Sequence, residues 1–64
     1  MVRINGESVE IADISVENYL LEAGYDLRRV AVELNGDIVP KAKYSDTYLC
    51  DGDKVEVVSF VGGG

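Results

Sequence analysis

The sequence has no histidine and only one cysteine, Cys50. A single cysteine cannot close an internal disulfide, and structural zinc sites are built from clusters of cysteine and histidine. Two common ways of stabilising a small domain are therefore excluded. Free cysteines are usually small buried side chains, and no basic residue lies next to Cys50 in the sequence, so we expect it to be buried and structural.

Basic residues are scarce as well. Six lysines and arginines stand against twelve aspartates and glutamates, which gives a formal net charge of −6 at pH 7. Nucleic acids bind proteins mainly through neutralised phosphates, and anionic membranes attract positive charge, so neither nucleic acid nor membrane is expected as a partner. The acidity favours solubility, and a basic protein surface would attract it.

Long apolar runs are missing too, because none approaches the ~20 residues that cross a bilayer. With no signal-peptide pattern, the expected location is the reducing cytoplasm. The 64 residues are still 47% apolar, an ordinary value for a globular domain. We therefore expect one small domain, which buries only about 60% of the surface that its unfolded chain exposes.

A turn motif and two helix-end residues organise the first part of the chain. Asn5-Gly6 lies between alternating apolar runs, which is the strongest short hairpin motif and predicts a hairpin over residues 1–12. Ser15 is typical of a helix N-cap, and Gly24 of the left-handed residue that follows a helix. Between these two ends the apolar residues recur on one helical face, at Val16, Tyr19, Leu20 and Ala23.

Strands and turns alternate in the second part. β-branched residues predict strands at 30–34 and 54–60, with a brief strand at 38–39 ended by Pro40. Asn35-Gly36 predicts a second tight turn. Residues 41–50 show no clean period, which predicts irregular structure or one helical turn with three side chains partly inward, those of Tyr44, Tyr48 and Leu49.

The element order is strand, strand, helix, strand, short strand, strand. It predicts an α+β fold, a single β-grasp (ubiquitin-like) domain over residues 1–60, with a mixed sheet of four to five strands and one main helix across one face. A right-handed crossover would place the last strand parallel to the first and beside it. We expect residues 61–64 to form a flexible C-terminal tail.

The last strand divides its side chains between two faces. Val55 and Val57 are the better core candidates, since the helix needs an apolar floor. Val58 and Phe60 are then left on the open face, where clustered apolar side chains mark an interaction site, although a bulge would turn Phe60 inward. We take Val58, Phe60 and Val61 as the candidate docking residues.

Three glycines, Gly62, Gly63 and Gly64, end the sequence. Without side chains they make a thin, flexible arm, and its terminal group is the carboxylate of Gly64. Such an arm can enter a narrow channel in a partner's active site, where that carboxylate can be activated. The alternative is that the glycines are tolerated because nothing packs on a chain end, or that they were added for expression.

Four segments together resemble the ubiquitin-like sulfur carriers of the MoaD–ThiS family, most closely the thiamine-pathway (ThiS) type. These are Met-Val-Arg-Ile-Asn-Gly at residues 1–6, the leucine-rich helix start at 15–21, Val-Ala-Val-Glu-Leu-Asn-Gly-Asp-Ile-Val-Pro at 30–40, and the Asp-Gly-Asp turn, apolar strand and glycine end at 51–64. Each segment alone is weak evidence for the family. Their combination in this order covers essentially the whole chain.

The resemblance implies a carrier and not an enzyme, with no cofactor of its own. An adenylating enzyme of the ubiquitin-activating (E1-like) type would use ATP and magnesium to adenylate the carboxylate of Gly64, and Gly62 and Gly63 would thread its channel. A sulfur donor, a cysteine desulfurase or persulfide protein, would then give a thiocarboxylate. Thiazole synthase would receive this sulfur for the thiazole ring of thiamine.

Three other functions stay open from the residues alone. The chain could carry sulfur to another acceptor, like the small subunit of molybdopterin synthase. It could be a ubiquitin-like modifier conjugated to lysines, which would share the terminal glycines. It could also be a non-covalent β-grasp interaction module with an inert tail.

Overall fold

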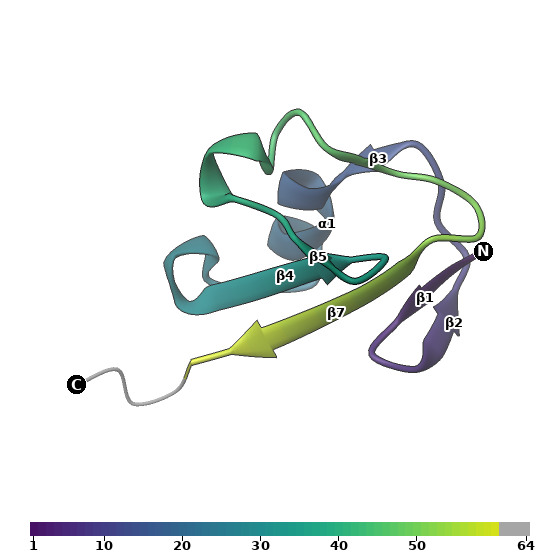
Figure 1. Ribbon diagram of the computed structural model, residues 1–64, viewed down its shortest axis with the longest axis horizontal. Helices are drawn as coiled ribbons and strands as arrows, with labels where there is room; N and C mark the ends of the chain where they lie inside the picture. Colours follow the sequence, from purple (N-terminus) through teal and green to yellow (C-terminus); the bar gives the residue numbers. More distant parts are fainter. Residues whose placement is uncertain (61–64) are drawn as a thin grey trace.

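A five-stranded mixed sheet carries one α-helix across one of its faces in the computed structural model, which describes residues 1–60 (Figure 1). The strand order across the sheet is β2-β1-β7-β4-β5. The strand bounds are β1 Val2–Ile4, β2 Glu7–Val9, β4 Val30–Leu34, β5 Asp37–Ile38 and β7 Lys54–Ser59. This confirms the predicted layout of one helix on a mixed sheet. The predicted tail, residues 61–64, lies outside the described residues.

The last strand occupies the centre of the sheet. β7 runs parallel to β1, with Ile4 paired to Val55, and antiparallel to β4, with Val32 paired to Val57. The parallel neighbour is the one that a right-handed crossover predicts. β7 therefore joins the N-terminal hairpin, β1–β2, to the β4–β5 hairpin.

Both Asn-Gly motifs form the predicted tight turns. Asn5 and Asn35 have φ angles of 51° and 52°, and the glycines that follow have φ angles of 86° and 91°. Left-handed backbone at both central positions defines the type I′ turn, whose twist matches that of the flanking strands. The second turn therefore fixes the register of β5, with Leu34 opposite Asp37 and Glu33 opposite Ile38.

The helix has the ends that the sequence predicts. α1 spans Val16–Glu22, and the hydroxyl of Ser15 accepts a hydrogen bond from the N–H of Asn18 at 3.0 Å. At the other end Gly24 has a φ of 88° and donates to the carbonyl of Leu21. The N–H of the next residue, Tyr25, donates to Leu20 at 2.9 Å, which completes a Schellman motif. With seven residues, α1 is also the longest described helix, and it is too short to span a membrane.

One helical residue departs from the predicted apolar face. Val16 and Leu20 are buried and Tyr19 is half-buried, but Ala23 is exposed. Ala23 is the C-cap residue of the helix and directly precedes Gly24, where the helix ends. The buried face therefore ends at Leu20, one turn earlier than the spacing predicts.

Residues 41–50 contain the predicted helical turn and a short strand that the sequence did not reveal. The turn is the 3-10 helix η2, Lys41–Lys43, and the strand is β6, Tyr48–Leu49. β6 pairs with β3, Ile14–Ser15, in a separate two-stranded sheet. Because side chains alternate along a strand, Leu49 points inward and Tyr48 outward, so the expectation of an inward Tyr48 is wrong.

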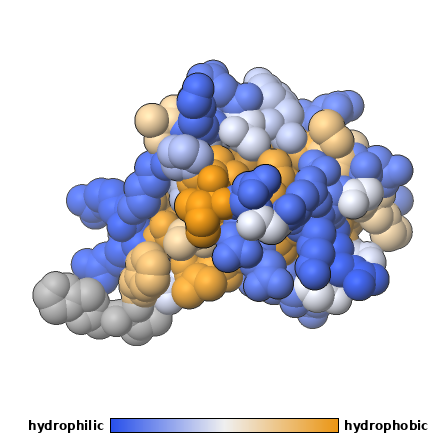
Figure 2. Space-filling model, in the orientation of Figure 1, coloured by the Kyte–Doolittle hydropathy of each residue, from blue (hydrophilic) through white to orange (hydrophobic). Residues whose placement is uncertain are grey.

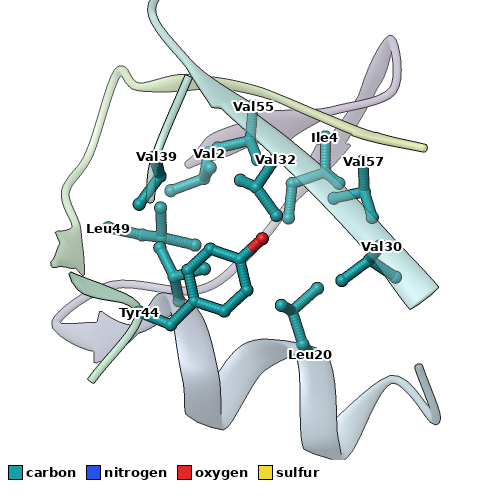
Figure 3. Packing of buried hydrophobic residues seen from close by; sticks show 11 residues of the cluster. Val2, Ile4, Leu20, Val30, Val32, Val39, Tyr44, Leu49, Val55 and Val57 are labelled. Carbon is teal, nitrogen blue, oxygen red and sulfur yellow. The ribbon is translucent and has the colours of Figure 1, made fainter. Parts of the chain in front are cut away.

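The core lies between α1 and the sheet (Figure 3). The ring of Tyr44 points into this cluster, and its burial raises the pKa of the phenol. The predicted core positions of the last strand, Val55 and Val57, are confirmed. Eleven hydrophobic residues make up the cluster, namely Val2, Ile4, Val16, Leu20, Val30, Val32, Val39, Tyr44, Leu49, Val55 and Val57.

Candidate functional site

The predicted docking residues within the described chain lie on the open face of the sheet, opposite to α1. Val58 is 54% exposed and Phe60 is 53% exposed. The alternation that buries Val55 and Val57 leaves Val58 and Phe60 outside, and no bulge turns Phe60 inward. The third predicted docking residue, Val61, lies outside the described residues.

The chain is fastened to the sheet at residue 60. The N–H of Phe60 donates to the carbonyl of Arg29 at 2.6 Å. Arg29 ends the 3-10 helix η1, Leu27–Arg29, and directly precedes β4. The pairing of β7 with β4 therefore extends one residue past the strand. The predicted tail residues Gly62, Gly63 and Gly64 follow this point and lie outside the described residues.

Two further apolar side chains share the open face. Ala31 is opposite Val58, and Ile38 is opposite Glu33 on the edge strand β5. Ile38 is 65% exposed and Ala31 is half-buried. We call the four residues Ala31, Ile38, Val58 and Phe60 the open-face patch. Figure 2 shows hydrophobic surface gathered over β4, β5 and the C-terminal end of β7, bordered by hydrophilic surface.

Sequence reasoning missed Ala31 and Ile38 as part of this surface. The position of Ile38 could have been predicted from the sequence, because a two-residue turn at Asn35-Gly36 places residue 38 opposite residue 33. Ala31 depends on the register between β4 and β7, which are far apart in the sequence. No local pattern gives such a register.

A pair of carboxylates lies beside the open-face patch. Glu33 on β4 and Glu56 on β7 are directly opposite each other in the antiparallel ladder. Both are exposed, and together with Asn35, Gly36 and Lys54 they line an open depression of about 380 Å³. Ion pairs among the described residues join Asp26 to two arginines and the N-terminus to Asp51, so neither glutamate has a cation of residues 1–60 within 4.0 Å.

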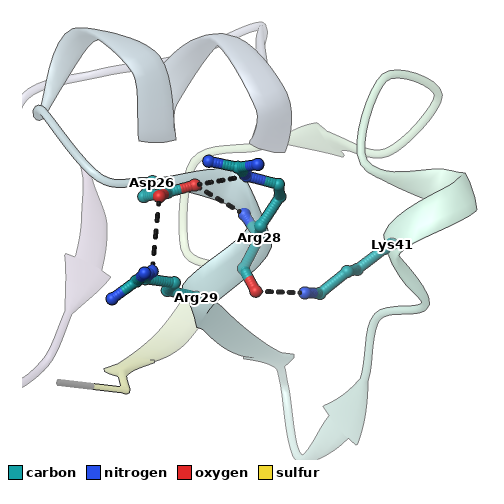
Figure 4. Close-up of polar contacts among 4 residues, drawn as sticks. All are labelled: Asp26, Arg28, Arg29 and Lys41. Carbon is teal, nitrogen blue, oxygen red and sulfur yellow. Dashed lines mark hydrogen bonds and ion pairs between the residues drawn. The ribbon is translucent and has the colours of Figure 1, made fainter. Parts of the chain in front are cut away.

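Three of the six basic residues gather near the end of β7 (Figure 4). Nε of Arg28 and Nε of Arg29 lie 3.5 and 3.7 Å from the carboxylate of Asp26. Nζ of Lys41 donates to the carbonyl of Arg28 at 2.9 Å. The N–H of Arg28 donates to Asp26 at 3.0 Å and lowers the pKa of that carboxyl, and the two guanidinium groups lower it further. The last described residue, Phe60, thus lies beside positive charge, since its N–H donates to the carbonyl of Arg29.

Cys50 is exposed, and the expectation of a buried thiol is wrong. The residue follows β6 and opens the turn that leads to β7. Its N–H donates to Oδ2 of Asp53 at 2.8 Å, and its thiol donates to the carbonyl of Tyr48 at 3.9 Å. Both hydrogen bonds are made to residues close by in the sequence. Residues 1–60 hold no group of three or more histidine, cysteine, aspartate or glutamate side chains placed to bind a metal ion.

Comparison with known proteins decides the family. A family model described as "ThiS family" matches residues 2–64. The chain belongs to the ThiS family. The sulfur carrier protein ThiS of Bacillus subtilis is 39% identical over 66 residues, and the alignment covers all of both chains.

A thiazole synthase of Paramagnetospirillum magneticum is 52% identical over 62 residues. The match covers 95% of this ThiS-family chain but only 19% of that protein, so the chain spans about a fifth of the length of this relative. A segment of ThiS type therefore occurs within a protein that bears the name of the synthase.

The structure of a thiamine biosynthesis protein (ThiS) from Geobacter metallireducens superposes with a TM-score of 0.75 at 33% identity. It covers 98% of this chain and 97% of that one. The predicted β-grasp fold and the predicted family are thereby confirmed.

Proposed function

We propose that this ThiS-family chain is a sulfur carrier in thiamine biosynthesis, and that it acts as a protein co-substrate and not as an enzyme. The observation that carries the proposal is the match to the sulfur carrier protein ThiS of Bacillus subtilis over the whole of both chains. The proposal includes a reducing, cytoplasmic location, which the single cysteine favours.

The proposal takes Gly64 as the terminal residue and its carboxylate as the group that carries sulfur. A carboxylate is a poor electrophile. An adenylating enzyme would transfer the AMP of ATP to it with release of pyrophosphate, and magnesium at that enzyme would balance the phosphate charge. The outer sulfur of a persulfide then forms a bond to the carbonyl carbon and AMP leaves, which gives an acyl disulfide with the donor cysteine. A second thiol attacks the donor sulfur of this S–S bond, forms a disulfide with it, and frees the thiocarboxylate. Gly62 and Gly63 serve reach, because a Cβ on either would widen the arm.

The geometry of the described residues supports this use of the tail. Val58 and Phe60, the proposed docking residues together with Val61, are exposed: Val58 occupies the last open-face position of β7, and Phe60 directly follows that strand. The hydrogen bond from Phe60 to Arg29 fixes where the chain leaves the sheet. A partner that covers the open-face patch therefore meets the point from which the tail starts.

Three partners follow from the proposal. They are an E1-like adenylating enzyme, a sulfur donor (a cysteine desulfurase or persulfide protein), and thiazole synthase as the sulfur acceptor. The similarity to a segment of a thiazole synthase supports the last of these. Joining two partners in one protein raises their effective concentration and favours transfer between them.

Intact-protein mass spectrometry tests the function. The chain is co-expressed with the adenylating enzyme and the sulfur donor of its own organism, and we expect a mass increase that corresponds to one terminal oxygen replaced by sulfur. A ladder of heavier conjugates would instead identify a protein modifier, and an unmodified mass with competent enzymes would identify a non-covalent module.

A variant that lacks Gly64 tests the site. We expect it to fold like the full chain, with an unchanged unfolding midpoint, and to gain no sulfur. Full sulfur loading of this shortened chain would refute Gly64 as the reacting residue.

A further inference from the structure

The open face of the sheet contains a pair of like charges that lowers the stability of the isolated domain. Glu33 and Glu56 are opposite each other on β4 and β7, and like charges in directly opposite positions destabilise a sheet. No cation of the described residues lies within 4.0 Å of either carboxylate. A sequence chosen for stability alone would place a lysine or a β-branched residue at one of these two positions.

Positions where local chemistry conflicts with the fold are expected to be functional. The conflict lies next to the open-face patch, because one step along β7 from Glu56 on this face is Val58, and Ile38 is opposite Glu33. Lys54 lines the same depression but lies on the other side of Glu56 from Val58 along the strand. The carboxylates therefore border the apolar surface directly.

We propose that the open face docks a basic protein surface in which an arginine or lysine enters between Glu33 and Glu56 while apolar side chains cover the open-face patch. The proposal rests on the proposed function, since the occupant is the adenylating enzyme that receives the tail. An arginine suits the site best, because its planar fork donates to two carboxylate groups at once. The net charge of −6 steers the domain toward such a surface.

A protein partner fits these observations better than a small cation. The two carboxylates are exposed and stand at the edge of apolar surface that continues to the root of the tail. A small cation would leave this apolar surface uncovered, whereas a protein surface buries it and neutralises the carboxylates in the same contact. The repulsion between Glu33 and Glu56, which destabilises the free domain, is then relieved in the complex.

Neutral variants separate this role from a structural one. Glu33→Gln, Glu56→Gln and the double variant are compared with Glu22→Gln, an exposed glutamate on α1 across the molecule. We expect the double variant to unfold at the same or a higher urea concentration and to bind the cognate adenylating enzyme about ten-fold or more weakly, with a shallower dependence on salt. Glu22→Gln should leave binding unchanged.

Glu56→Lys makes the test sharper, because the new lysine pairs with Glu33. We expect this variant to raise the unfolding midpoint and to abolish measurable binding. Unchanged binding by the double variant, or by Glu56→Lys, would overturn the proposal. Equal losses in Glu22→Gln would overturn it as well, since they would reflect net charge and not this site.

The binding assay needs no sulfur chemistry, so it can fail independently of the proposed function. A wild-type chain that gains sulfur but shows no dependence on Glu33 and Glu56 retains its carrier role and loses this docking site. A wild-type chain that binds through these glutamates but gains no sulfur keeps the docking site and loses the carrier role.

Discussion

The side-chain carboxamide of Asn5 forms hydrogen bonds with both the N–H and the carbonyl of Val57. Oδ1 accepts from the N–H of Val57 at 2.8 Å, and Nδ2 donates to its carbonyl at 3.2 Å. β1 ends one residue before Asn5, so the side chain continues the pairing that the strand no longer provides. On the other side of β7, Oδ1 of Asn35 accepts from the N–H of Lys54 at 2.9 Å, and its Nδ2 donates to the carboxylate of Asp53 at 3.0 Å.

We predict that Asn5→Gly lowers the free energy of unfolding by about 1–3 kcal/mol, because it leaves polar backbone of β7 without a partner. Glycine keeps the positive φ of 51° without strain, so the loss reflects the missing carboxamide together with the greater freedom of glycine in the unfolded chain. Asn5→Ala should cost roughly 0.5–1 kcal/mol more, since a Cβ disfavours that backbone conformation. Urea denaturation measures both, and an Asn5→Gly variant as stable as wild type would contradict the prediction.

Adjacent valines on β7 should respond differently to truncation. Val57 is 7% exposed and Val58 is 54% exposed. Val57→Ala removes buried volume and should lower the free energy of unfolding by about 1–3 kcal/mol. Val58→Ala should change it by less than about 0.5 kcal/mol. Similar losses in the two variants would show that the faces of β7 are assigned wrongly.

The open-face patch should matter for binding more than for folding. We predict that Val58→Asp weakens association with the adenylating enzyme about ten-fold or more, since a charge would be placed in an apolar contact. Leu21→Asp is the matched control, because Leu21 is 56% exposed on α1, on the other side of the sheet. Calorimetric titration of both variants checks this. Equal binding by a well-folded Val58→Asp variant would count against the patch.

The carboxyl of Asp26 should contribute to acid sensitivity. Its pKa in the folded chain lies below the ordinary value of 3.8, chiefly because the N–H of Arg28 donates to it. A lowered folded pKa means that the contribution is complete above the unfolded pKa and is lost as the pH falls through the folded pKa. We predict that Asp26→Asn melts below wild type near neutral pH and that the two melting curves converge in strong acid. A constant difference across this range would disprove the linkage.

Local chemistry explains what the sequence could predict. Asn5-Gly6 and Asn35-Gly36 fix their own backbone, and Ser15 and Gly24 fix the ends of α1, so these features need no information from distant residues. Tyr48 and Cys50 were misplaced because their environment depends on the pairing of β6 with β3, two strands of two residues each. Strands of two residues are too short to show an alternation of apolar and polar side chains in the sequence.

In the candidate site, too, local patterns predict some residues and long-range strand register decides others. Val58 and Phe60 follow from alternation within one strand, and the structure confirms their exposure. The opposition of Glu33 and Glu56 requires the register between β4 and β7, which long-range packing sets. The role of Gly64 remains a prediction from the sequence and its family, because the described residues end at Phe60.

Among the five strands of the main sheet within residues 1–60, β7 is synthesised last, yet the other four lie to one side of it or the other. A nascent or truncated chain without residues 54–59 therefore has two separate hairpins and no sheet to join them. Such fragments should remain unfolded and be degraded by proteases. Biogenesis itself would thus present the proposed docking surface only on chains synthesised at least as far as Ser59.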